Sequence, residues 1–398
     1  MTPTSRRVYA DHAASAPLRD VAVQAMAETA SLLNPAGQYA SGRTASRVVE
    51  DARETVAELL GADRAEVVFT GSGTEADTIA VQGLAFGALS SRGARVIHSS
   101  AAEHPAVGET VDWLCGGMPV PDGPLFRHAP LPLDASGCPG APESALDPAI
   151  DAVVTAMWAN NETGNITDLG PVVAAAGDAG VPVHVDAVQA VGHLPVDFHS
   201  LGATTLAASA HKFGGPKSVG ILLARRDAVL KSPLRGGGQE RGIRSGTVNP
   251  QGAAGTAAAL AEAVAEMQEE NDRLAGYQRR LLQVVRSIPD AVVHTDPGTG
   301  TGAGALPSHI HASFPGAEGD SLIMLLDAAG VDASTGSACS AGVNRASHVL
   351  TAMGVDVATA RGALRLTTGP ATTDEDIDRL CAMLPGVVDQ ARAAGMAY

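Results

Sequence analysis

The sequence is poor in aromatic and basic residues, and it has no long uninterrupted hydrophobic run. Aromatic residues make up 3% of the 398 residues, and 27 Lys and Arg stand against 43 Asp and Glu, which gives a formal charge of -16. An acidic protein is repelled by the phosphate backbone of nucleic acids and by anionic membranes. We therefore expect no direct nucleic-acid partner and no membrane partner.

Cysteine is also scarce, and four positions are scattered along the chain: Cys115, Cys138, Cys339 and Cys381. None lies in the close pairs typical of zinc sites and disulfide frameworks, so we predict no metal site and a reducing compartment. The N-terminal residues reach Asp11 before any apolar stretch develops, unlike a signal peptide. Gly, Pro or a charge interrupts every apolar stretch before 18 residues. These features indicate a cytoplasmic protein.

The composition that is present, with 45% hydrophobic and 18% charged residues, is that of a globular protein whose length predicts two domains, or three. Helical and strand-like runs alternate from about residue 45, which is typical of an α/β fold with a mostly parallel sheet. We predict a helix over 46–60 that stops at Gly61. We predict buried strands over 66–70, 94–98, 152–157, 181–185, 204–208 and 219–224.

The C-terminal part of the chain has a different pattern. Residues 250–288 are rich in Ala, Leu, Glu, Gln and Arg, which predicts one long helix or two in succession. The Gly-rich segment 296–304 predicts a loop, because no residue in it offers a packing face. The chain from about 305 to 398 is long enough for a small α+β unit. We find no internal repeat.

The segment Thr70–Ala76, with the sequence Thr-Gly-Ser-Gly-Thr-Glu-Ala, lies between a predicted strand and an apolar helix. Backbone N–H groups at such a helix start, with the Thr74 hydroxyl beside them, can hold a phosphate. The glycine spacing also matches a dinucleotide fingerprint, but Ser90–Gly93 and His98–Ser100 stand where that motif needs an acidic residue. A structural turn is the other interpretation that the segment allows.

Asp186 and Lys212 each stand at the end of an apolar strand-like run. Ligands of open α/β sheets bind at such strand ends, and a buried charge there is costly unless it is paired. A lysine can form a Schiff base with an aldehyde cofactor, and an aspartate can keep a pyridine nitrogen protonated. Each residue alone is more often a surface charge. Together with a phosphate cradle at Thr74, however, they are the three groups that pyridoxal phosphate (PLP) requires.

Cys339 lies in the segment Ser334–Gly342, which consists of small residues without a large apolar neighbour. Exposed thiols in flexible surroundings are the reactive ones. We therefore predict a reactive Cys339 and small buried side chains at Cys115, Cys138 and Cys381.

With these residues in place, the sequence closely resembles the cysteine desulfurases, PLP-dependent enzymes of the class V aminotransferase family. The resemblance covers nearly the whole chain, and its motifs follow the family's order: Tyr9–Ala13, Gly73–Glu75, Glu103–His104, Trp158–Glu162, His184–Gln189, Ser209–Lys212, Gly236–Thr247, Gly336–Cys339 and Arg365–Gly369. It implies the fold type I of PLP-dependent transferases. A large PLP-binding domain with a mostly parallel mixed sheet would span 15–262. A smaller α+β domain would span 1–14 and 263–398, with the cysteine loop at about 331–345.

The resemblance also implies a role for each site residue. Lys212 would hold PLP covalently and then move protons at the substrate α-carbon, and Asp186 would pair with the pyridine nitrogen. His104 would stack on the ring and act as acid or base. Further contacts would be made to the phenolic oxygen and the phosphate by Asn161, Gln189, Gly73, Thr74, Ser209 and His211, and by Thr247 from the second subunit of a homodimer.

For the substrate L-cysteine, the resemblance implies that Arg365, together with Asn34, binds the carboxylate. The Cys339 thiolate would attack the substrate sulfur and keep it as a persulfide while alanine leaves. A flexible loop suits this role, because the sulfur must be collected inside the site and delivered outside it. The loop type resembles the branch that serves iron–sulfur assembly or thiolation, which implies a sulfur-acceptor or iron–sulfur scaffold protein as partner.

Two segments depart from the family pattern. Tyr39 stands where the family commonly has His, and Ala76-Asp-Thr78 stands where it has Ser-Asp-Asn. These changes concern the substrate and the acceptor more than the cofactor. Two other functions stay open: a PLP-dependent C–S or C–Se lyase of a specialised pathway, which would need Lys212 but not Cys339, and a non-catalytic scaffold, which would be colourless.

Overall fold

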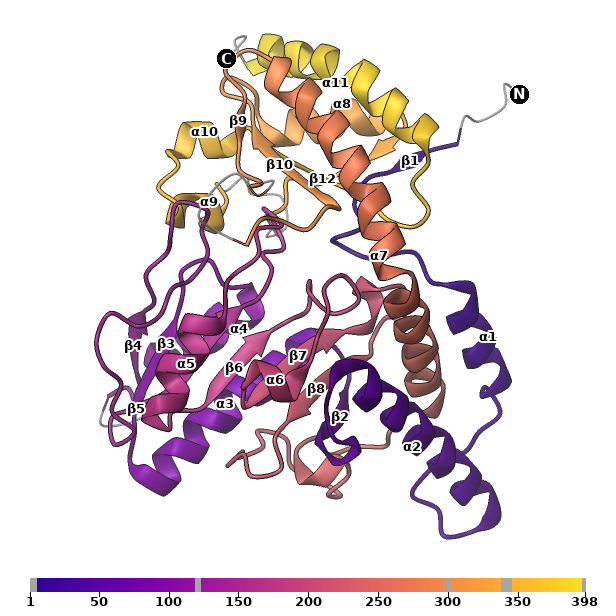
Figure 1. Ribbon diagram of the computed structural model, residues 1–398, viewed down its shortest axis with the longest axis vertical. Coiled ribbons are helices and arrows are strands. Elements are labelled where there is room, and N and C mark those ends of the chain that lie inside the picture. Colours follow the sequence, from indigo (N-terminus) through magenta and orange to yellow (C-terminus); the bar gives the residue numbers. More distant parts are fainter. Residues whose placement is uncertain (1–5, 119–122, 297, 299–302, 338–345, 396–398) are drawn as a thin grey trace.

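The computed structural model describes residues 6–118, 123–296, 298, 303–337 and 346–395 (Figure 1). Cys339 lies outside these residues. Within the described ranges, none of the helices combines the length and the apolar character that a bilayer crossing requires.

A seven-stranded sheet forms the centre of the larger part of the molecule, with the strand order β2-β8-β7-β6-β5-β3-β4. β8 is antiparallel to both of its neighbours, and the pairs from β7 to β4 are parallel. The strands are β2 Val67–Thr70, β3 Val96–Ser99, β4 Arg127–Pro130, β5 Asp151–Met157, β6 Val183–Asp186, β7 Thr205–Ser209 and β8 Gly220–Ala224. Every residue of β5, β6, β7 and β8 is buried, as expected for strands covered on both faces. The fold is therefore α/β with a mixed, mostly parallel sheet.

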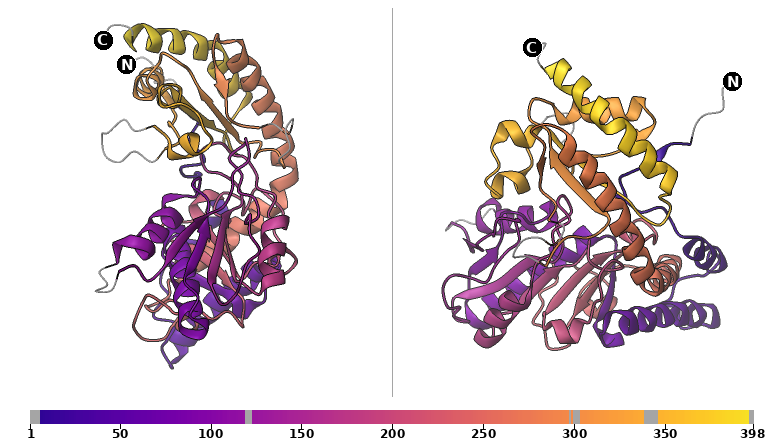
Figure 2. Two further views of the ribbon diagram at one scale, coloured as in Figure 1. Left: turned by 90° about the vertical axis from the view of Figure 1, so that its left-hand side faces the viewer. Right: turned by 45° about the horizontal axis from the view of Figure 1, so that its top comes forward.

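Helices and short helical turns surround this sheet (Figures 1 and 2). The helices are α1 Asp20–Glu28, α2 Ala40–Leu60, α3 Gly73–Arg92, α4 Pro105–Asp112, α5 Gly170–Ala179 and α6 Phe198–Leu201. The short turns are η1 Arg64–Glu66, η2 Trp113–Gly117, η3 Ala210–Lys212 and η4 Glu240–Gly242. Buried side chains of α2, α5 and α7 form one core with the sheet, and those of α3 and α4 form others.

α7 (Pro250–Ser287) is a single helix of 38 residues that links the two parts of the molecule (Figure 1). Its first half, through Ala263, belongs to the core of the large sheet. Its second half, from Leu274 to Val285, belongs to a separate core in the C-terminal part. The predicted domain boundary at 262–263 falls inside this helix and remains a prediction.

The C-terminal part contains a small sheet with the order β12-β10-β9 and a parallel pair of β1 with β11. Its strands are β1 Val8–Tyr9, β9 Val292–Val293, β10 His309–Ser313, β11 Val331–Asp332 and β12 Ala363–Thr367. Its helices are α8 Gly319–Ala328, α9 His348–Ala352, α10 Val357–Arg361 and α11 Asp374–Gly395. The pairing of β1 with β11 places the N-terminal residues in this unit.

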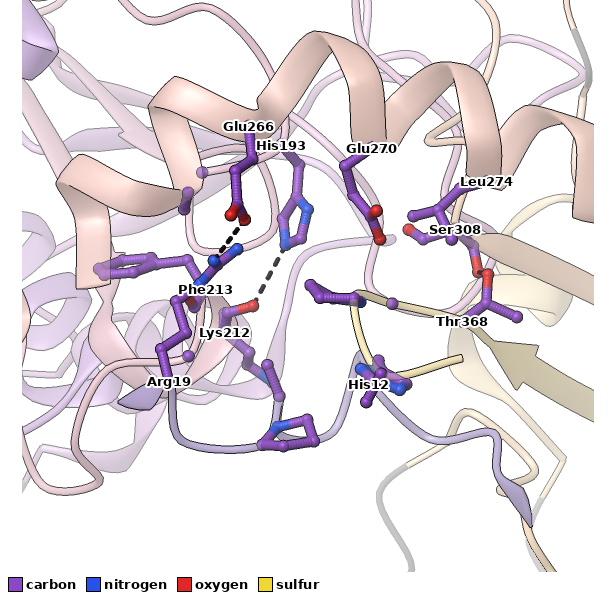
Figure 3. A pocket seen from close by; sticks show the side chains of 18 of the residues that line it. His12, Arg19, His193, Lys212, Phe213, Glu266, Glu270, Leu274, Ser308 and Thr368 are labelled. Atoms are coloured by element: carbon purple, nitrogen blue, oxygen red, sulfur yellow. Dashed lines mark hydrogen bonds and ion pairs between the residues drawn. The ribbon is translucent and has the colours of Figure 1, made fainter. Parts of the chain in front are cut away.

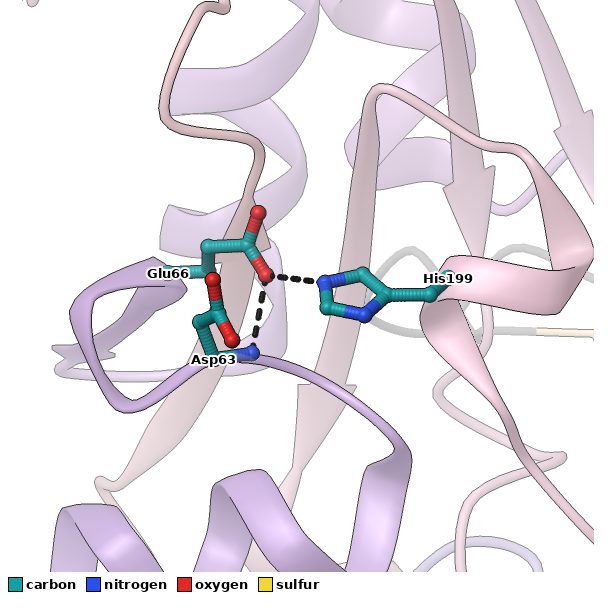
Figure 4. Close-up of side chains that lie close together, drawn as sticks. All are labelled: Asp63, Glu66 and His199. Carbon is teal, nitrogen blue, oxygen red and sulfur yellow. Dashed lines mark hydrogen bonds and ion pairs between the residues drawn. The ribbon is translucent and has the colours of Figure 1, made fainter.

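A cluster of Asp63, Glu66 and His199 joins the start of β2 to α6 (Figure 4). The Glu66 carboxylate accepts hydrogen bonds from the Asp63 backbone N–H at 2.9 Å and from His199 Nε2 at 2.7 Å. Asp63 and Glu66 also form the reciprocal cap of η1. These contacts satisfy the buried Glu66 side chain and give the cluster a structural role.

Candidate active site

Parallel strands bring their C-terminal ends to one edge of the large sheet, and polar side chains gather there. Asp186 ends β6 and Ser209 ends β7, which is the neighbouring parallel strand. A cavity of about 380 Å³ opens at this edge. The predicted residues that line it are Gly73, Thr74, His104, Asn161, Asp186, Gln189, Ser209, His211, Lys212 and Arg365. The structure thus brings these residues together, while their individual roles remain predictions.

Lys212 enters the cavity from η3, directly after β7. Its Nζ donates hydrogen bonds to the backbone carbonyls of Ala13 at 2.6 Å and Ala14 at 3.1 Å. Burial lowers the pKa of Lys212 to about 8, and the nearby Arg365 guanidinium adds to this effect. At pH 7 about a tenth of this amine is then neutral, far more than of an exposed lysine, which makes it a better nucleophile toward an aldehyde.

Two carboxylates share the floor of the cavity. Asp186 and Asp77 both have oxygens within 4.8 Å of each other and of a His104 ring nitrogen. Burial raises the pKa of Asp77 well above its usual range, and the adjacent Asp186 carboxylate raises it further. Asp77 is also held by His184, whose Nε2 lies 3.2 Å from Asp77 Oδ1 and whose Nδ1 bonds the Thr205 hydroxyl at 2.9 Å. Burial also raises the pKa of Asp186, but the hydrogen bond from the Val188 backbone N–H and the charge of Lys212 oppose that rise. We infer that Asp77 is the carboxyl that carries a proton, so that Asp186 is the carboxylate available to a protonated ring nitrogen.

The N-terminus of α3 forms an anion cradle beside these carboxylates. The Ser72 hydroxyl caps the helix by accepting from the Glu75 backbone N–H at 3.0 Å. Gly73 N–H faces the Ser209 hydroxyl at 3.4 Å, and a Cβ at Gly73 would lie 2.9 Å from Val188 and 3.0 Å from Ser209. The close backbone approach therefore needs glycine. A helix start with two hydroxyls is a suitable phosphate site.

The remaining predicted cofactor contacts lie around the same cavity. His104 caps α4, because its Nδ1 accepts from the Ala106 backbone N–H at 3.1 Å, which leaves Nε2 as the ring's donor. Burial lowers the pKa of His104, and it lowers that of His211 to about 4. The imidazoles of His104 and His211 are therefore neutral near pH 7, and His104 can stack on a ring without adding charge. Gln189, which lines the same cavity, donates from Nε2 to the Ala13 carbonyl at 3.0 Å.

Arg365, on β12, reaches the cavity from the C-terminal part of the molecule. Its Nη1 donates to the Asn161 carbonyl and its Nη2 to Asp11 Oδ1, both at 2.7 Å. Its Nε is buried and has no hydrogen-bond partner among the described residues. A buried charged donor without a partner is costly, so a carboxylate ligand is expected on this side of the guanidinium.

The residues present fit PLP. An amine of lowered pKa, a buried carboxylate and an anion cradle face one cavity, as an aldehyde, a pyridinium nitrogen and a phosphate require. The free Nε of Arg365 adds a position for a substrate carboxylate.

Two predicted residues lie elsewhere. Asn34 and Thr247 do not line this cavity but a separate one of about 390 Å³, the Arg53 cavity. That cavity also contains the buried Arg53, whose guanidinium binds both oxygens of Glu240 at 2.8 and 2.7 Å. Within one chain, Asn34 therefore lies apart from Arg365, and the pairing of these two residues is not formed. The predicted reach of Thr247 into another subunit is a separate prediction.

The structure also places the residues that precede Cys339 and the residues that depart from the family pattern. Ser334, Gly336 and Ser337, which precede Cys339, line the first cavity. Tyr39 does not line it and is 56% exposed. Ala76 is fully buried on α3, where it packs against the sheet core. The departure at Ala76 therefore concerns helix packing behind the cradle.

The other three cysteines lie in surroundings that disfavour the thiolate. Burial raises the pKa of Cys115 to about 11 and that of Cys138 to about 12, and it also raises that of Cys381. Cys138 is buried, as predicted, whereas Cys115 and Cys381 are half-buried.

Sequence reasoning missed four groups at the site: Asp11, the Ala13 carbonyl, Asp77 and His184. Asp11 and His184 lie inside motifs that the resemblance used, and an acidic residue two positions after a short strand was a usable signal for Asp11. The Ala13 carbonyl carries no side-chain signal. Asp77 lies one helical turn after Thr74, but only the fold shows that this turn faces Asp186.

Comparisons with known proteins find a family, relatives and solved structures that are similar to this chain. The family model for class-V aminotransferases matches residues 8–380. The IscS-like cysteine desulfurase of Mycobacterium tuberculosis is 42% identical over 395 residues, which cover 98% of each chain. A solved NifS-like protein superposes with a TM-score of 0.85 at 30% identity, covering 96% of this chain and 100% of the other. The structure of SspA in complex with cysteine superposes with a TM-score of 0.75 at 28% identity, covering 92% and 100%.

Proposed function

The chain belongs to the class-V aminotransferase family and is a PLP-dependent cysteine desulfurase of fold type I, and we propose that it passes the sulfur of L-cysteine to Cys339 as a persulfide. The observation that carries this proposal is one cavity that joins Lys212, Asp186 and the α3 cradle to Arg365. The first three of these groups serve the cofactor directly, and Arg365 matches the carboxylate that any α-amino acid substrate brings.

When bound, PLP supplies an electron sink for the electron pair released at the substrate α-carbon. The protein's own residues do the rest. Arg365 binds the carboxylate through its free Nε, and Asp11 and the Asn161 carbonyl hold the guanidinium in place. Lys212, whose pKa burial lowers to about 8, takes and returns the proton at the α-carbon. Asp186 keeps the ring nitrogen protonated.

We propose that the Cys339 thiolate then attacks the substrate sulfur. An S–S bond forms on Cys339, the C–S bond breaks, and the electron pair of that bond stays with the carbon, which is protonated to give L-alanine. Ser337 lines the cavity, and Cys339 follows it by two residues, which span at most about 7 Å. The raised thiol pKa values of Cys115 and Cys138 also favour Cys339 as the acceptor.

We further propose that the enzyme acts as a homodimer in the cytoplasm and delivers sulfur to an iron–sulfur scaffold or a thiolation acceptor. The dimer is supported by Asn34 and Thr247, which line one cavity away from Arg365 and so are available to a second subunit. The three described cysteines are free, which suits a reducing compartment. Light scattering of the active enzyme tests the dimer, and a monomer with full activity would contradict it.

The experiment for the reaction is a steady-state assay with L-cysteine and a thiol reductant that quantifies alanine, sulfide and pyruvate together. We expect equal alanine and sulfide without pyruvate. The variant Cys339→Ala should lose this activity, whereas Cys381→Ala should keep it. Full turnover by Cys339→Ala would exclude the persulfide step, and pyruvate with sulfide would indicate a C–S lyase.

A further inference from the structure

Two short segments of the described structure stand on either side of Cys339 in the sequence, residues 334–337 before it and residues 346–348 after it. The first segment lies along the strand that carries Arg365. Ser334 forms an antiparallel backbone bridge with Arg365, whose backbone N–H donates to the Ser334 carbonyl at 2.7 Å. The chain before Cys339 is therefore fixed to the same strand as the substrate-binding guanidinium.

Side chains hold the second segment, residues 346–348. The Ser347 hydroxyl caps α9 and donates to the Glu162 carboxylate. His348 Nε2 donates to the Glu103 backbone carbonyl at 3.0 Å. Because α9 belongs to the C-terminal part and Glu162 follows β5 of the large sheet, these hydrogen bonds join the two parts of the molecule (Figure 1).

Glu162 lies between the two segments. Its side chain is 1% exposed, and its carboxylate accepts the hydrogen bond from Ser347. On the other side, a Cβ added at Gly336 would lie 3.5 Å from the Cβ of Glu162 and 3.5 Å from that of Arg365. One buried side chain is thus close to the chain before Cys339 and bonded to the chain after it.

The turn that carries Glu162 is itself held in place. Asn160 Oδ1 accepts from the backbone N–H groups of Glu162 and of the next residue, at 2.9 and 3.0 Å. The Asn161 carbonyl of the same turn accepts from Arg365 Nη1 at 2.7 Å. The turn therefore fixes the substrate-binding arginine on one side and residues 346–348 on the other.

The partners of Glu162 offset the cost of burying its carboxyl group. Burial raises the pKa of Glu162, whereas the hydrogen bond from Ser347 and the charges of His348 and Arg365 lower it. His348 Nδ1 lies 3.9 Å from Glu162 Oε1. A buried carboxylate is costly unless it is paired, and here the paired groups belong to residues 346–348 and to the substrate site.

We propose that Glu162 is a positioning residue for the transfer of sulfur to Cys339, because it ties residues 346–348 to the turn that holds Arg365. This inference rests on the proposed function. In the transfer, an S–S bond forms on Cys339, the C–S bond of the substrate breaks, and its electron pair stays with the carbon. Glu162 exchanges no proton and forms no covalent bond in this step. Its loss should therefore slow sulfur transfer and spare the steps that need only the cofactor, Lys212 and Arg365.

The test compares two reactions of the same holoenzyme. Exchange of the α-hydrogen of L-alanine with deuterated water, followed by NMR, needs the cofactor, Lys212 and Arg365 but no thiol. Conversion of L-cysteine to alanine also needs Cys339. Glu162→Ala should lower kcat for L-cysteine about 10- to 100-fold, because misplacing a reacting group is costly, while the exchange rate changes less than about twofold. The affinity of the apoprotein for PLP, measured by absorbance, should stay the same.

Conservative variants separate positioning from folding. Glu162→Gln keeps an oxygen that can accept from Ser347, so it should retain more of kcat than Glu162→Ala. Ser347→Ala should lower kcat and spare the exchange, whereas Ser347→Thr, which keeps the hydroxyl, should restore most of kcat. Glu66→Gln is the matched control, since Glu66 is also a buried glutamate but does not line the active-site cavity. It should change neither reaction.

Equal losses of exchange and of alanine formation in Glu162→Ala and Ser347→Ala would overturn the proposal, since they would assign Glu162 to the cofactor site or to folding. Unchanged kcat in both variants would also overturn it. If one variant fails to fold, the other and Glu162→Gln still give the comparison. Failure of the proposed function is distinguishable, because it would be seen with Glu162 intact, as full turnover by Cys339→Ala or as pyruvate from the unmodified enzyme.

Discussion

Lys212 lines two cavities, the active-site cavity of about 380 Å³ and a second one of about 370 Å³ (Figure 3), and the two are built in different ways. Polar groups of the first lie at the ends of β6 and β7 and at the start of α3, where backbone N–H groups and strand ends converge. Those of the second project from the side of α7 and from the loop that contains His12. Strand ends and helix starts fix a ligand through the backbone, which suits a cofactor. The side of a helix offers only side chains, and the carboxylates of α7 there are already paired with Arg19 and Arg273.

The largest effect is expected at Lys212, which lines both cavities but serves the reaction in the first. Lys212→Ala should lower turnover of L-cysteine by about a thousandfold or more, because the base and the covalent attachment disappear together. The product assay measures this effect, with Lys217→Ala, an exposed neighbour, as the control. Substantial turnover by Lys212→Ala would contradict the assignment of this lysine.

Within the first cavity, the two neighbouring carboxylates should respond differently. Asp186→Asn should weaken cofactor binding and lower kcat about a hundredfold or more, because an amide cannot keep the ring nitrogen protonated. Asp77→Asn should have only a small effect, since the carboxylic acid that we infer there already resembles an amide. Spectroscopic titration of each apoprotein with PLP measures cofactor binding, and the product assay gives kcat. Equal losses in the two variants would show that Asp77 is charged.

The substrate side of the first cavity depends on Arg365. Arg365→Gln should raise the KM for L-cysteine about 10- to 100-fold, because one charge-assisted hydrogen-bonded pair with the carboxylate is lost. Arg361→Gln, at an exposed position, is the matched control. Initial rates over a range of L-cysteine concentrations give the values, and an unchanged KM would place the carboxylate elsewhere.

The smallest effect is a pH dependence. Burial lowers the pKa of Lys212 to about 8, so its reactive neutral form is populated as the pH rises through about 8. The rate of PLP uptake by the apoprotein should therefore rise with a midpoint near 8. Acetyl-lysine amide, as a control, should show the midpoint of an exposed lysine, about 10.4. Stopped-flow absorbance measures both rates, and coincident midpoints would show that burial does not activate this lysine.

Much of the fold could be predicted from local patterns. The six predicted strands coincide with β2, β3, β5, β6, β7 and β8 to within two residues at each end, because strands that are buried on both faces have short apolar runs as their sequence pattern. The predicted helix ends at Gly61 as expected, with φ +61°, but it begins at Ala40 rather than 46. Residues 40–45 are mostly small or polar, so they lack the helical spacing of apolar residues on which the prediction depended. β4 is mostly exposed, and β9 has two residues, so neither has a strand signal.

The candidate site could be predicted from the sequence where a motif lies at the end of a strand or at the start of a helix, as at Asp186, Lys212 and Thr74. The second cavity could not be predicted in this way. It requires α7 to pass residues 12–20, which are separated from it by more than two hundred positions. The lysine's hydrogen bonds to Ala13 and Ala14 are equally long-range.

The most direct test of the proposed reaction is a single turnover of the holoenzyme with L-cysteine in the absence of a thiol reductant. Alanine is quantified, and the peptide that contains Cys339 is examined by mass spectrometry without reduction. We predict one alanine per active site and a mass increase of one sulfur atom on Cys339. Pyruvate in place of alanine, or alanine with an unmodified Cys339, would contradict the account.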